Sequence, residues 1–155
     1  MKYYYIYNFN LCTLGIAEKD DAVSNIFFDK NNPPKGFEKQ ETPLLKKTSK
    51  QLEEYFTGKR KVFDLPLALY GTTFRIKVWE TLQTIPYGET RSYGEIAAMI
   101  SNPLASRAVG MANHVNQLSI IIPCHRVIGH NGSLTGYAGG LELKRKLLEL
   151  EKKYK

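Results

Sequence analysis

Residues 118–127 read Leu-Ser-Ile-Ile-Ile-Pro-Cys-His-Arg-Val, an apolar run that leads through a proline into a cysteine–histidine pair. The run Leu118 to Ile122 predicts a buried strand that carries the thiol of Cys124 into a shaped site. A cysteine is a nucleophile only as its thiolate, and a base such as His125 can generate that thiolate. Adjacent residues of an extended chain point to opposite sides, so we expect the two side chains to act through a water molecule. The stretch indicates nucleophilic chemistry; the alternative is a cysteine that merely fills space in a core.

The composition indicates a soluble globular protein with an anionic partner. Of the 155 residues, 43% are hydrophobic and 24% are charged, which is ordinary for such a protein. The formal net charge of +7 and the isoelectric point near 9.3 are less ordinary. An excess of Lys and Arg favours nucleic acid as the partner, although a merely basic surface would carry the same charge.

Cysteine content and the first residues point to a reducing compartment. Cys12 and Cys124 are the only cysteines, too few for the disulfide framework of a small secreted protein. They form no Cys-x-x-Cys pair and no Cys/His cluster, so no structural zinc is expected. Residues 1–7 lack the apolar core of a signal peptide, and no apolar run approaches the length of a membrane span. We expect a cytoplasmic protein without a membrane partner.

Two domains of an α+β fold are predicted, residues 1–70 and residues 71–155. The first should be a small sheet-and-helix domain. Thr42 and Pro43 are typical of a helix N-cap and first helical position, and Gly58 should end that helix. The predicted strands of this domain cover residues 3–9, 11–17 and 22–28.

The second domain is predicted to be mainly helical. Ser92 and Glu95 have the spacing of a capping box, which begins a helix. Asn102-Pro103 interrupts the helical pattern, and a second helix should follow over residues 104–113. Two short helices joined by a tight turn are typical of a helix-turn-helix, although many such hairpins bind nothing. Further helices are predicted from Thr72 or Thr73 to about Ile85 and over residues 141–153.

Two further features favour a nucleic-acid partner. Arg107 lies among the small residues Ala105, Ser106 and Ala108, which would let a helix approach DNA closely while the arginine reaches inward. The alternative is a solvated surface arginine. The glycine-rich stretch 129–140 can bring its backbone close to a flat ligand, and it lacks the Lys-Ser/Thr ending of a phosphate loop.

Taken together, the motifs resemble the methylated-DNA–protein-cysteine methyltransferases, which are the 6-O-alkylguanine-DNA alkyltransferases. The resemblance is close over residues 72–151 and looser before them. It implies a ribonuclease-H-like N-terminal domain and a winged helix-turn-helix-type C-terminal domain. The motifs that carry it are Ser92-Tyr93-Gly94-Glu95, Ser106-Arg107-Ala108-Val109-Gly110, Asn116, Ile122-Pro123-Cys124-His125-Arg126-Val127 and Tyr137-Ala138-Gly139-Gly140-Leu141.

The resemblance implies a single-use DNA repair enzyme. Cys124 matches the residue that irreversibly accepts a methyl or small alkyl group from 6-O-alkylguanine, and from 4-O-alkylthymine, in double-stranded DNA. His125 and Glu151 match the pair that draws the thiol proton through a water, and Asn116 matches the residue that orients this network. Tyr93 matches the tyrosine that crowds the DNA phosphate and gives a proton to guanine N3. Such a donor lowers the barrier, because guanine leaves poorly as an anion.

The resemblance also implies a DNA surface and a base pocket. Chemistry on a stacked guanine requires the base to leave the duplex, and Arg107 matches the residue that fills the gap. Arg126 is expected to play a structural role. The other residues expected at the DNA are Ser92, Tyr93, Ala105 and Ser106. The residues expected around the guanine are Ser119, Val127, Tyr137 and Ala138.

Two departures from the family pattern affect these expectations. The stretch Asn116-Gln117-Leu118-Ser119 lacks the prolines that many relatives have after the asparagine, which predicts a looser or reshaped pocket wall and a different range of accepted alkyl groups. The N-terminal part lacks the Cys/His ligands of zinc-bearing relatives, so zinc is not carried over. We expect a monomer without metal or cofactor.

Three alternatives differ in what they predict for Cys124. An alkyltransferase-like protein binds damaged DNA without transferring the group, but it has no cysteine at this position. An unrelated Cys-His hydrolase would leave the helix pair with Arg107 unexplained. A transcription regulator would contain an inert cysteine.

Overall fold

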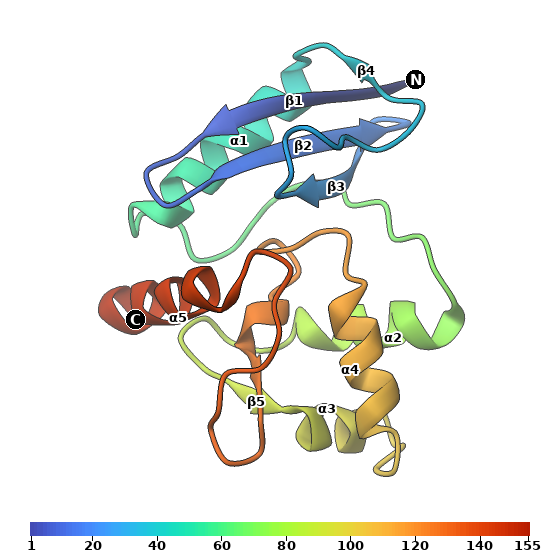
Figure 1. Cartoon of the computed structure of the whole chain (residues 1–155), viewed down its shortest axis with the longest axis vertical. Coiled ribbons are helices and arrows are strands. Elements are labelled where there is room, and N and C mark those ends of the chain that lie inside the picture. The colour runs from blue at the N-terminus through green and yellow to red at the C-terminus, as the bar shows by residue number, and fades with distance from the viewer. The chain divides into compact units, whose positions relative to one another are not determined.

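The computed structural model describes residues 1–155, and the chain divides into two compact units, Met1–Leu69 and Tyr70–Lys155 (Figure 1). The first unit combines a β-sheet with one long helix, and the second is mainly helical, so the predicted α+β class is confirmed. None of the helices combines the length and the apolar composition that crossing a membrane requires.

The N-terminal unit is built on a four-stranded sheet with the order β3-β2-β1-β4. The central strand β1 (Lys2–Asn8) pairs antiparallel with β2 (Thr13–Lys19), which in turn pairs antiparallel with β3 (Ala22–Phe27). These are the three strands that the sequence predicts. A fourth strand, β4 (Glu38–Lys39), was not predicted; it is two residues long and lies parallel to β1 at the sheet edge.

One helix, α1 (Pro43–Phe56), packs against this sheet. It begins as predicted, because the Thr42 hydroxyl accepts a hydrogen bond from the Leu45 amide at 3.2 Å and proline occupies the first helical position. Gly58 follows the helix with φ of 78°, a conformation that glycine adopts without strain. The core of this unit includes the fully buried side chains Leu14, Ile16, Val23, Leu45, Leu52 and Tyr55.

The C-terminal unit contains four α-helices. They are α2 (Thr73–Leu82), α3 (Tyr93–Met99), α4 (Ser106–His114) and α5 (Leu141–Tyr154). The predicted capping box is confirmed: Ser92 Oγ accepts from the Glu95 amide at 3.1 Å, and Glu95 Oε1 accepts from the Ser92 amide at 2.9 Å. Helix α4 packs against α2 and α3, and Trp79 Nε1 donates to the Ala112 carbonyl at 2.8 Å (Figure 1). The α3–α4 pair therefore forms the predicted helix-turn-helix.

The prediction of a strand before Cys124 was wrong. Leu118 to Ile122 is buried, but the Ile122 amide donates to the Leu118 carbonyl at 2.9 Å and closes a turn. Within this turn Ile120 has φ of 75°, which β-branched residues rarely adopt. Cys124–Arg126 then forms one turn of 3₁₀ helix, η1, rather than extended chain. The expectation that Cys124 and His125 point to opposite sides assumed an extended chain and loses its basis.

A small parallel ladder holds the segment that follows η1. Strand β5 (Arg91–Ser92) pairs with β6 (Val127–Ile128), with Arg91 opposite Val127. Because β5 leads directly into α3, this ladder connects the start of that helix, and with it Tyr93, to the chain immediately after the cysteine turn.

Candidate active site

Cys124 lies at the start of η1 and is 3% exposed. The backbone on both sides of the thiol is fixed. Its amide donates to the Ile122 carbonyl at 2.7 Å, and its carbonyl accepts from Nδ2 of Asn113 at 3.3 Å. Asn113 projects from the buried side of α4, so the helix that carries Arg107 also positions the cysteine turn.

The surroundings of the Cys124 thiol shift its pKa in opposite directions. Burial is the largest effect and raises the pKa of Cys124, while hydrogen bonding to Asn116 and Ser119 and the positive charge of Lys144 lower it. The net pKa is above the ordinary value, so the resting thiol is protonated at neutral pH and requires a base. The three groups that lower the pKa stabilise the thiolate once it forms.

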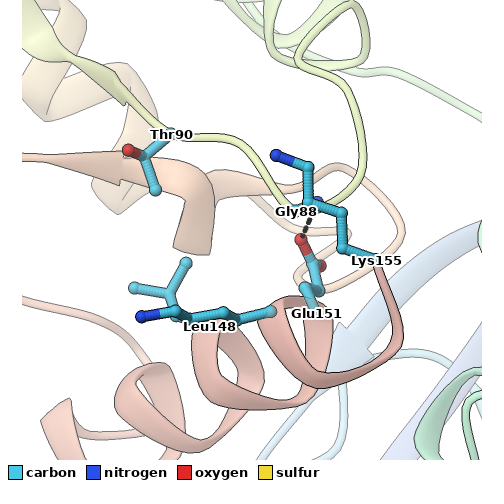
Figure 2. A pocket seen from close by; sticks show the side chains of 6 residues that line it. Gly88, Thr90, Leu148, Glu151 and Lys155 are labelled. Carbon is cyan, nitrogen blue, oxygen red and sulfur yellow. Dashed lines mark hydrogen bonds between the residues drawn. The ribbon is translucent and has the colours of Figure 1, made fainter.

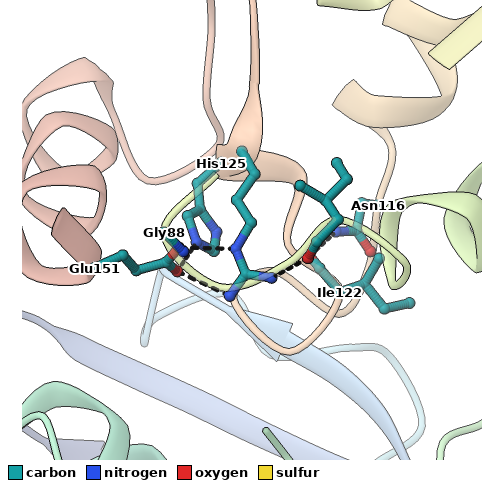
Figure 3. A network of polar contacts seen from close by, with 7 residues as sticks. Gly88, Asn116, Ile122, His125 and Glu151 are labelled. Atoms are coloured by element: carbon teal, nitrogen blue, oxygen red, sulfur yellow. Dashed lines mark hydrogen bonds and ion pairs between the residues drawn. The ribbon is translucent and has the colours of Figure 1, made fainter. Parts of the chain in front are cut away.

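Asn116 holds the turn that precedes the cysteine. Its Nδ2 donates to the Ile122 carbonyl at 3.0 Å, and its Oδ1 accepts from the Leu118 amide at 2.9 Å. Figure 3 shows Asn116 and Ile122 at one end of the polar network. One buried amide therefore ties together the two ends of the 118–122 turn, in which Ile120 has its unusual conformation.

A buried charge cluster lies at the other end of the network (Figure 3). His125 Nε2 and Glu151 Oε2 are 2.7 Å apart, and both side chains are buried. Arg126 also binds Glu151, with Nε donating to Oε1 at 2.8 Å and Nη2 donating to Oε2 at 3.1 Å. Its Nη1 donates to the Ile85 carbonyl at 2.7 Å, and the Gly88 amide donates to Glu151 Oε1 at 3.1 Å. The carboxylate thus accepts hydrogen bonds from three directions.

The protonation states follow from this cluster. Burial of Glu151 raises its pKa, but the hydrogen bonds from His125 and Arg126 and the charge of Arg126 outweigh burial and lower the pKa to about 2. Burial lowers the pKa of His125 below its ordinary value, although Glu151 acts in the opposite direction. Arg126 already balances the carboxylate, so the resting pair is a neutral imidazole beside an anionic Glu151. A neutral, oriented imidazole can accept a proton, and the carboxylate stabilises the resulting cation.

Lys144 is a site residue that the sequence reasoning missed. Its side chain is fully buried, and Nζ donates to the Val127 carbonyl at 2.7 Å and to the Thr135 carbonyl at 3.2 Å. It thereby ties β6 to the glycine-rich stretch, and its charge acts on Cys124. A signal was present in α5, because Lys144 lies seven residues before Glu151 and shares the helix face of Leu147.

Tyr93 is held at the first position of α3. Its hydroxyl is 2.5 Å from the Thr135 hydroxyl, and a Cβ at Gly110 would lie 3.9 Å from its ring. The tyrosine therefore spans between α4 and the glycine-rich stretch. Thr135 contacts both Tyr93 and Lys144, a shared role that the sequence reasoning did not assign.

The remaining predicted site residues are those expected around the guanine and those expected at the DNA. Val127 and Ser119 are buried near the thiol, and Tyr137 is half-buried with its ring 6.5 Å from the His125 ring in an edge-on orientation. Ala138 is exposed in the glycine-rich stretch. Arg107 is exposed on α4, while Ser92, Ala105 and Ser106 are half-buried at the starts of α3 and α4.

A cavity of about 360 Å³ borders the buried cluster on the side of Gly88 (Figure 2). It shares Glu151 with the cluster but contains none of the other predicted site residues, so we do not assign it to the base. Its lining residues are Gly88, Thr90, Leu148, Glu151, Lys152 and Lys155.

The excess positive charge belongs mainly to the unit that contains this site. Residues 70–155 include 11 Lys and Arg against 6 Glu and no Asp, a net +5 of the total +7. A surface of this charge attracts a polyanion.

Comparison with known proteins agrees with this arrangement. Residues 73–153 match the model of the 6-O-methylguanine DNA methyltransferase, DNA binding domain, and residues 2–69 match that of its ribonuclease-like domain. The chain belongs to the 6-O-methylguanine DNA methyltransferase family. The family resemblance carried by the motifs is thereby confirmed.

Relatives of this methyltransferase family member match it over nearly its whole length. It is 48% identical to the constitutive methylated-DNA–protein-cysteine methyltransferase of Bacillus subtilis, covering 98% of this chain and 96% of that protein. It is also 48% identical to the corresponding protein of Methanosarcina acetivorans, covering 96% and 97%. The crystal structure of Mycobacterium tuberculosis OGT in complex with DNA superposes with a TM-score of 0.91 at 44% identity, covering 98% of this chain and 94% of that one.

Proposed function

We propose that this chain repairs alkylated DNA by transferring a methyl or small alkyl group from O6 of guanine to Sγ of Cys124, once per molecule. The observation that carries the proposal is a buried thiol on a fixed turn that also carries a buried, neutral imidazole bound to an anionic carboxylate. Relatives at 48% identity are named methylated-DNA–protein-cysteine methyltransferases. The same chemistry extends to 4-O-alkylthymine, whose alkyl group is bonded to a similar oxygen.

The first step is a proton transfer from the thiol to the base. His125 takes the Cys124 proton, through a water as expected from the family, and Glu151 stabilises the imidazolium that forms. The Sγ–carbon bond then forms as the carbon–O6 bond breaks. Asn116, Ser119 and Lys144 favour the thiolate during this step, since each lowers the Cys124 pKa. General-base catalysis of this kind contributes roughly 10²- to 10⁴-fold in rate.

The departing guanine requires a proton in the same step. Tyr93 gives this proton to N3, so that guanine leaves as a neutral base, and the tyrosine regains a proton from solvent. The short contact with Thr135 supports this role, because it orients the Tyr93 hydroxyl without a charged partner. Arg107 fills the gap in the duplex while the nucleotide occupies a pocket formed by Val127, Tyr137, Ala138 and Ser119.

The reaction ends with a thioether, which has no route back to a thiolate on this chain. The protein therefore acts once. We propose that it does so as a monomer, without metal or cofactor. A free thiol of this kind is preserved in a reducing compartment, which favours a cytoplasmic location. A protein that only bound the damage would not need the His125–Glu151 pair beside a thiol.

Duplex DNA with a labelled methyl group on guanine O6 tests the proposal. We expect at most one label per protein molecule, located in the peptide that contains Cys124. Cys124→Ser should remain unlabelled, and Cys12→Ser is the matched control that should be labelled fully. Repeated turnover, or label on another residue, would contradict the proposal.

A further inference from the structure

Asn113 contains a buried polar atom that has no partner in the chain. Its side-chain carbonyl oxygen, Oδ1, is enclosed and accepts no hydrogen bond, and the residue as a whole is 6% exposed. A buried acceptor without a donor costs stability, so folded proteins seldom contain one without a further reason such as a ligand. The mechanism derived above does not use this oxygen.

The other half of the same amide places this oxygen beside the reacting cysteine. Asn113 Nδ2 donates to the Cys124 carbonyl at 3.3 Å, and because only the nitrogen of an amide can donate, Oδ1 is the end that remains unpaired. Both atoms are bonded to one carbon, so Oδ1 lies close to the Cys124 backbone. The other buried residues of α4, Val109 and Ala112, have apolar side chains and supply no donor.

A base that reacts with Cys124 has to enter this region. The cysteine is 3% exposed, so the base that meets Sγ passes into a part of the protein that is as enclosed as Asn113. The base of 6-O-alkylguanine has one hydrogen-bond donor, the exocyclic 2-amino group, because the alkyl group on O6 leaves N1 without a hydrogen. The base of 4-O-alkylthymine has no donor. An unpaired acceptor beside the thiol therefore matches one substrate and not the other.

We infer that Asn113 Oδ1 accepts a hydrogen bond from the 2-amino group of the extruded guanine, and that the protein therefore prefers 6-O-alkylguanine to 4-O-alkylthymine. The inference rests on the proposed function and assigns the choice of substrate within it to one side chain. A site with a buried acceptor discriminates against a substrate that lacks the donor, because the acceptor then stays unpaired. Guanine gains a hydrogen bond that thymine cannot make.

The other polar side chains around Cys124 are engaged or unsuited to this role. Both ends of the Asn116 amide hold the turn before the cysteine, and the Ser119 hydroxyl hydrogen-bonds to the Cys124 thiol. The Lys144 ammonium has no acceptor atom. Anchoring the Cys124 carbonyl requires only Nδ2 of Asn113, so a purely structural role leaves Oδ1 unexplained.

Duplex DNA that contains 6-O-methylguanine or 6-O-methylhypoxanthine tests the inference, because the second base differs only in lacking the 2-amino group. The second-order rate constant of methyl transfer to Cys124 is measured for each base, and the ratio of the two is compared between proteins. We expect the wild type to prefer 6-O-methylguanine by about tenfold, and Asn113→Leu, which has no acceptor, to reduce this ratio towards 1. Asn102→Leu is the matched control, because Asn102 is exposed in the turn before α4 and should keep the wild-type ratio.

The ratio separates this role from a structural one and from the proposed function. Loss of the Nδ2 anchor in Asn113→Leu slows both substrates alike, so it leaves the ratio unchanged. An unchanged ratio in the variant, or a wild-type ratio near 1, would overturn the inference, while methylation of Cys124 by either base would still support the function. Asn113→Ala gives the same comparison if Asn113→Leu does not fold. No transfer to Cys124 from either base would contradict the function itself.

Discussion

The two cysteines of this chain differ in how their surroundings treat a thiolate. Cys12 lies between β1 and β2, where burial raises its pKa to about 11. Cys124 is more deeply buried, and burial raises its pKa as well, but Asn116, Ser119 and Lys144 act against burial. Burial by itself therefore makes a thiol unreactive, and reactivity comes from the groups that favour the thiolate and from a base that can remove the proton.

Of the changes that test this difference between the two thiols, removal of the buried Glu151 carboxylate should have the largest effect. In Glu151→Gln, His125 loses the anion that stabilises its protonated form, so methyl transfer should slow by roughly 100-fold. Arg126 loses its charged partner, which should lower the free energy of unfolding by about 3–5 kcal/mol. Glu149→Gln is the control, since Glu149 pairs with Arg145 on the exposed side of the same helix. Single-turnover kinetics and urea unfolding measure both effects, and a wild-type rate would remove Glu151 from the mechanism.

The stability lost in Glu151→Gln should depend on pH. The pKa of Glu151 is about 2 in the folded chain against an ordinary value of 4.5. A carboxyl group with a lowered pKa contributes stability that is complete above its ordinary pKa and is lost as the pH falls towards the folded value. The difference in unfolding free energy between wild type and variant should therefore narrow from pH 5 to pH 3, measured by urea titration. A constant difference would contradict this assignment.

Removal of the buried cation should have a smaller effect. Lys144→Met keeps the length of the side chain but deletes the charge that lowers the Cys124 pKa. The thiol pKa should rise, so less thiolate forms and transfer at pH 7 should slow several-fold. The pH–rate profile should shift to higher pH, while that of Lys146→Met, an exposed lysine of the same helix, should not. An unshifted Lys144→Met profile would limit Lys144 to a structural role.

Alkylation itself should weaken the site. The added methyl group has to fit where a buried thiol was packed, and overpacking typically costs about 1–3 kcal/mol. The thermal midpoint of fully methylated protein, measured without DNA, should fall below that of the unmodified protein. Cys124→Ala, which cannot be methylated, serves as the control for the incubation. An unchanged or higher midpoint would show that the pocket accommodates the group freely.

Substitution of the other thiol should have the smallest effect. Cys12 is in the N-terminal unit, and its thiol is almost fully protonated at neutral pH because its pKa is about 11. Cys12→Ser should transfer methyl groups at the wild-type rate, measured under the same single-turnover conditions. A rate reduced by more than about twofold would give Cys12 a role in the reaction.

Local signals in the sequence predicted much of the fold. Ser92 with Glu95, and Thr42 with Pro43, carry the hydrogen bonds that begin their helices, so residue type and spacing were sufficient there. The turn at 118–122 could not be predicted, because a short apolar run fits a strand and a buried turn equally well. Ile120 has its positive φ inside a turn whose ends Asn116 holds by two hydrogen bonds, and no local pattern reveals that arrangement.

In the candidate site, too, local sequence predicted some residues and missed those that depend on long-range contacts. The pentapeptide Pro123–Val127 located the thiol, and the family resemblance supplied Glu151, which lies 26 residues from His125 in the sequence. Lys144 was missed because lysine is ordinarily exposed, and only the backbone carbonyls of Val127 and Thr135 make its burial tolerable. Long-range contacts of this kind appear only when the chain is folded.

The pH dependence of methyl transfer in wild type and His125→Ala tests the central claim most directly. Burial raises the Cys124 pKa, so without its base the transfer rate should follow the small thiolate fraction and rise about tenfold per pH unit. The His125 pKa lies below its ordinary value, so the wild-type rate should be nearly level above pH 7 and fall only under more acidic conditions. The account predicts a large deficit of His125→Ala at pH 7 that shrinks towards pH 9. Parallel profiles, or a variant as fast as the wild type at pH 7, would contradict it.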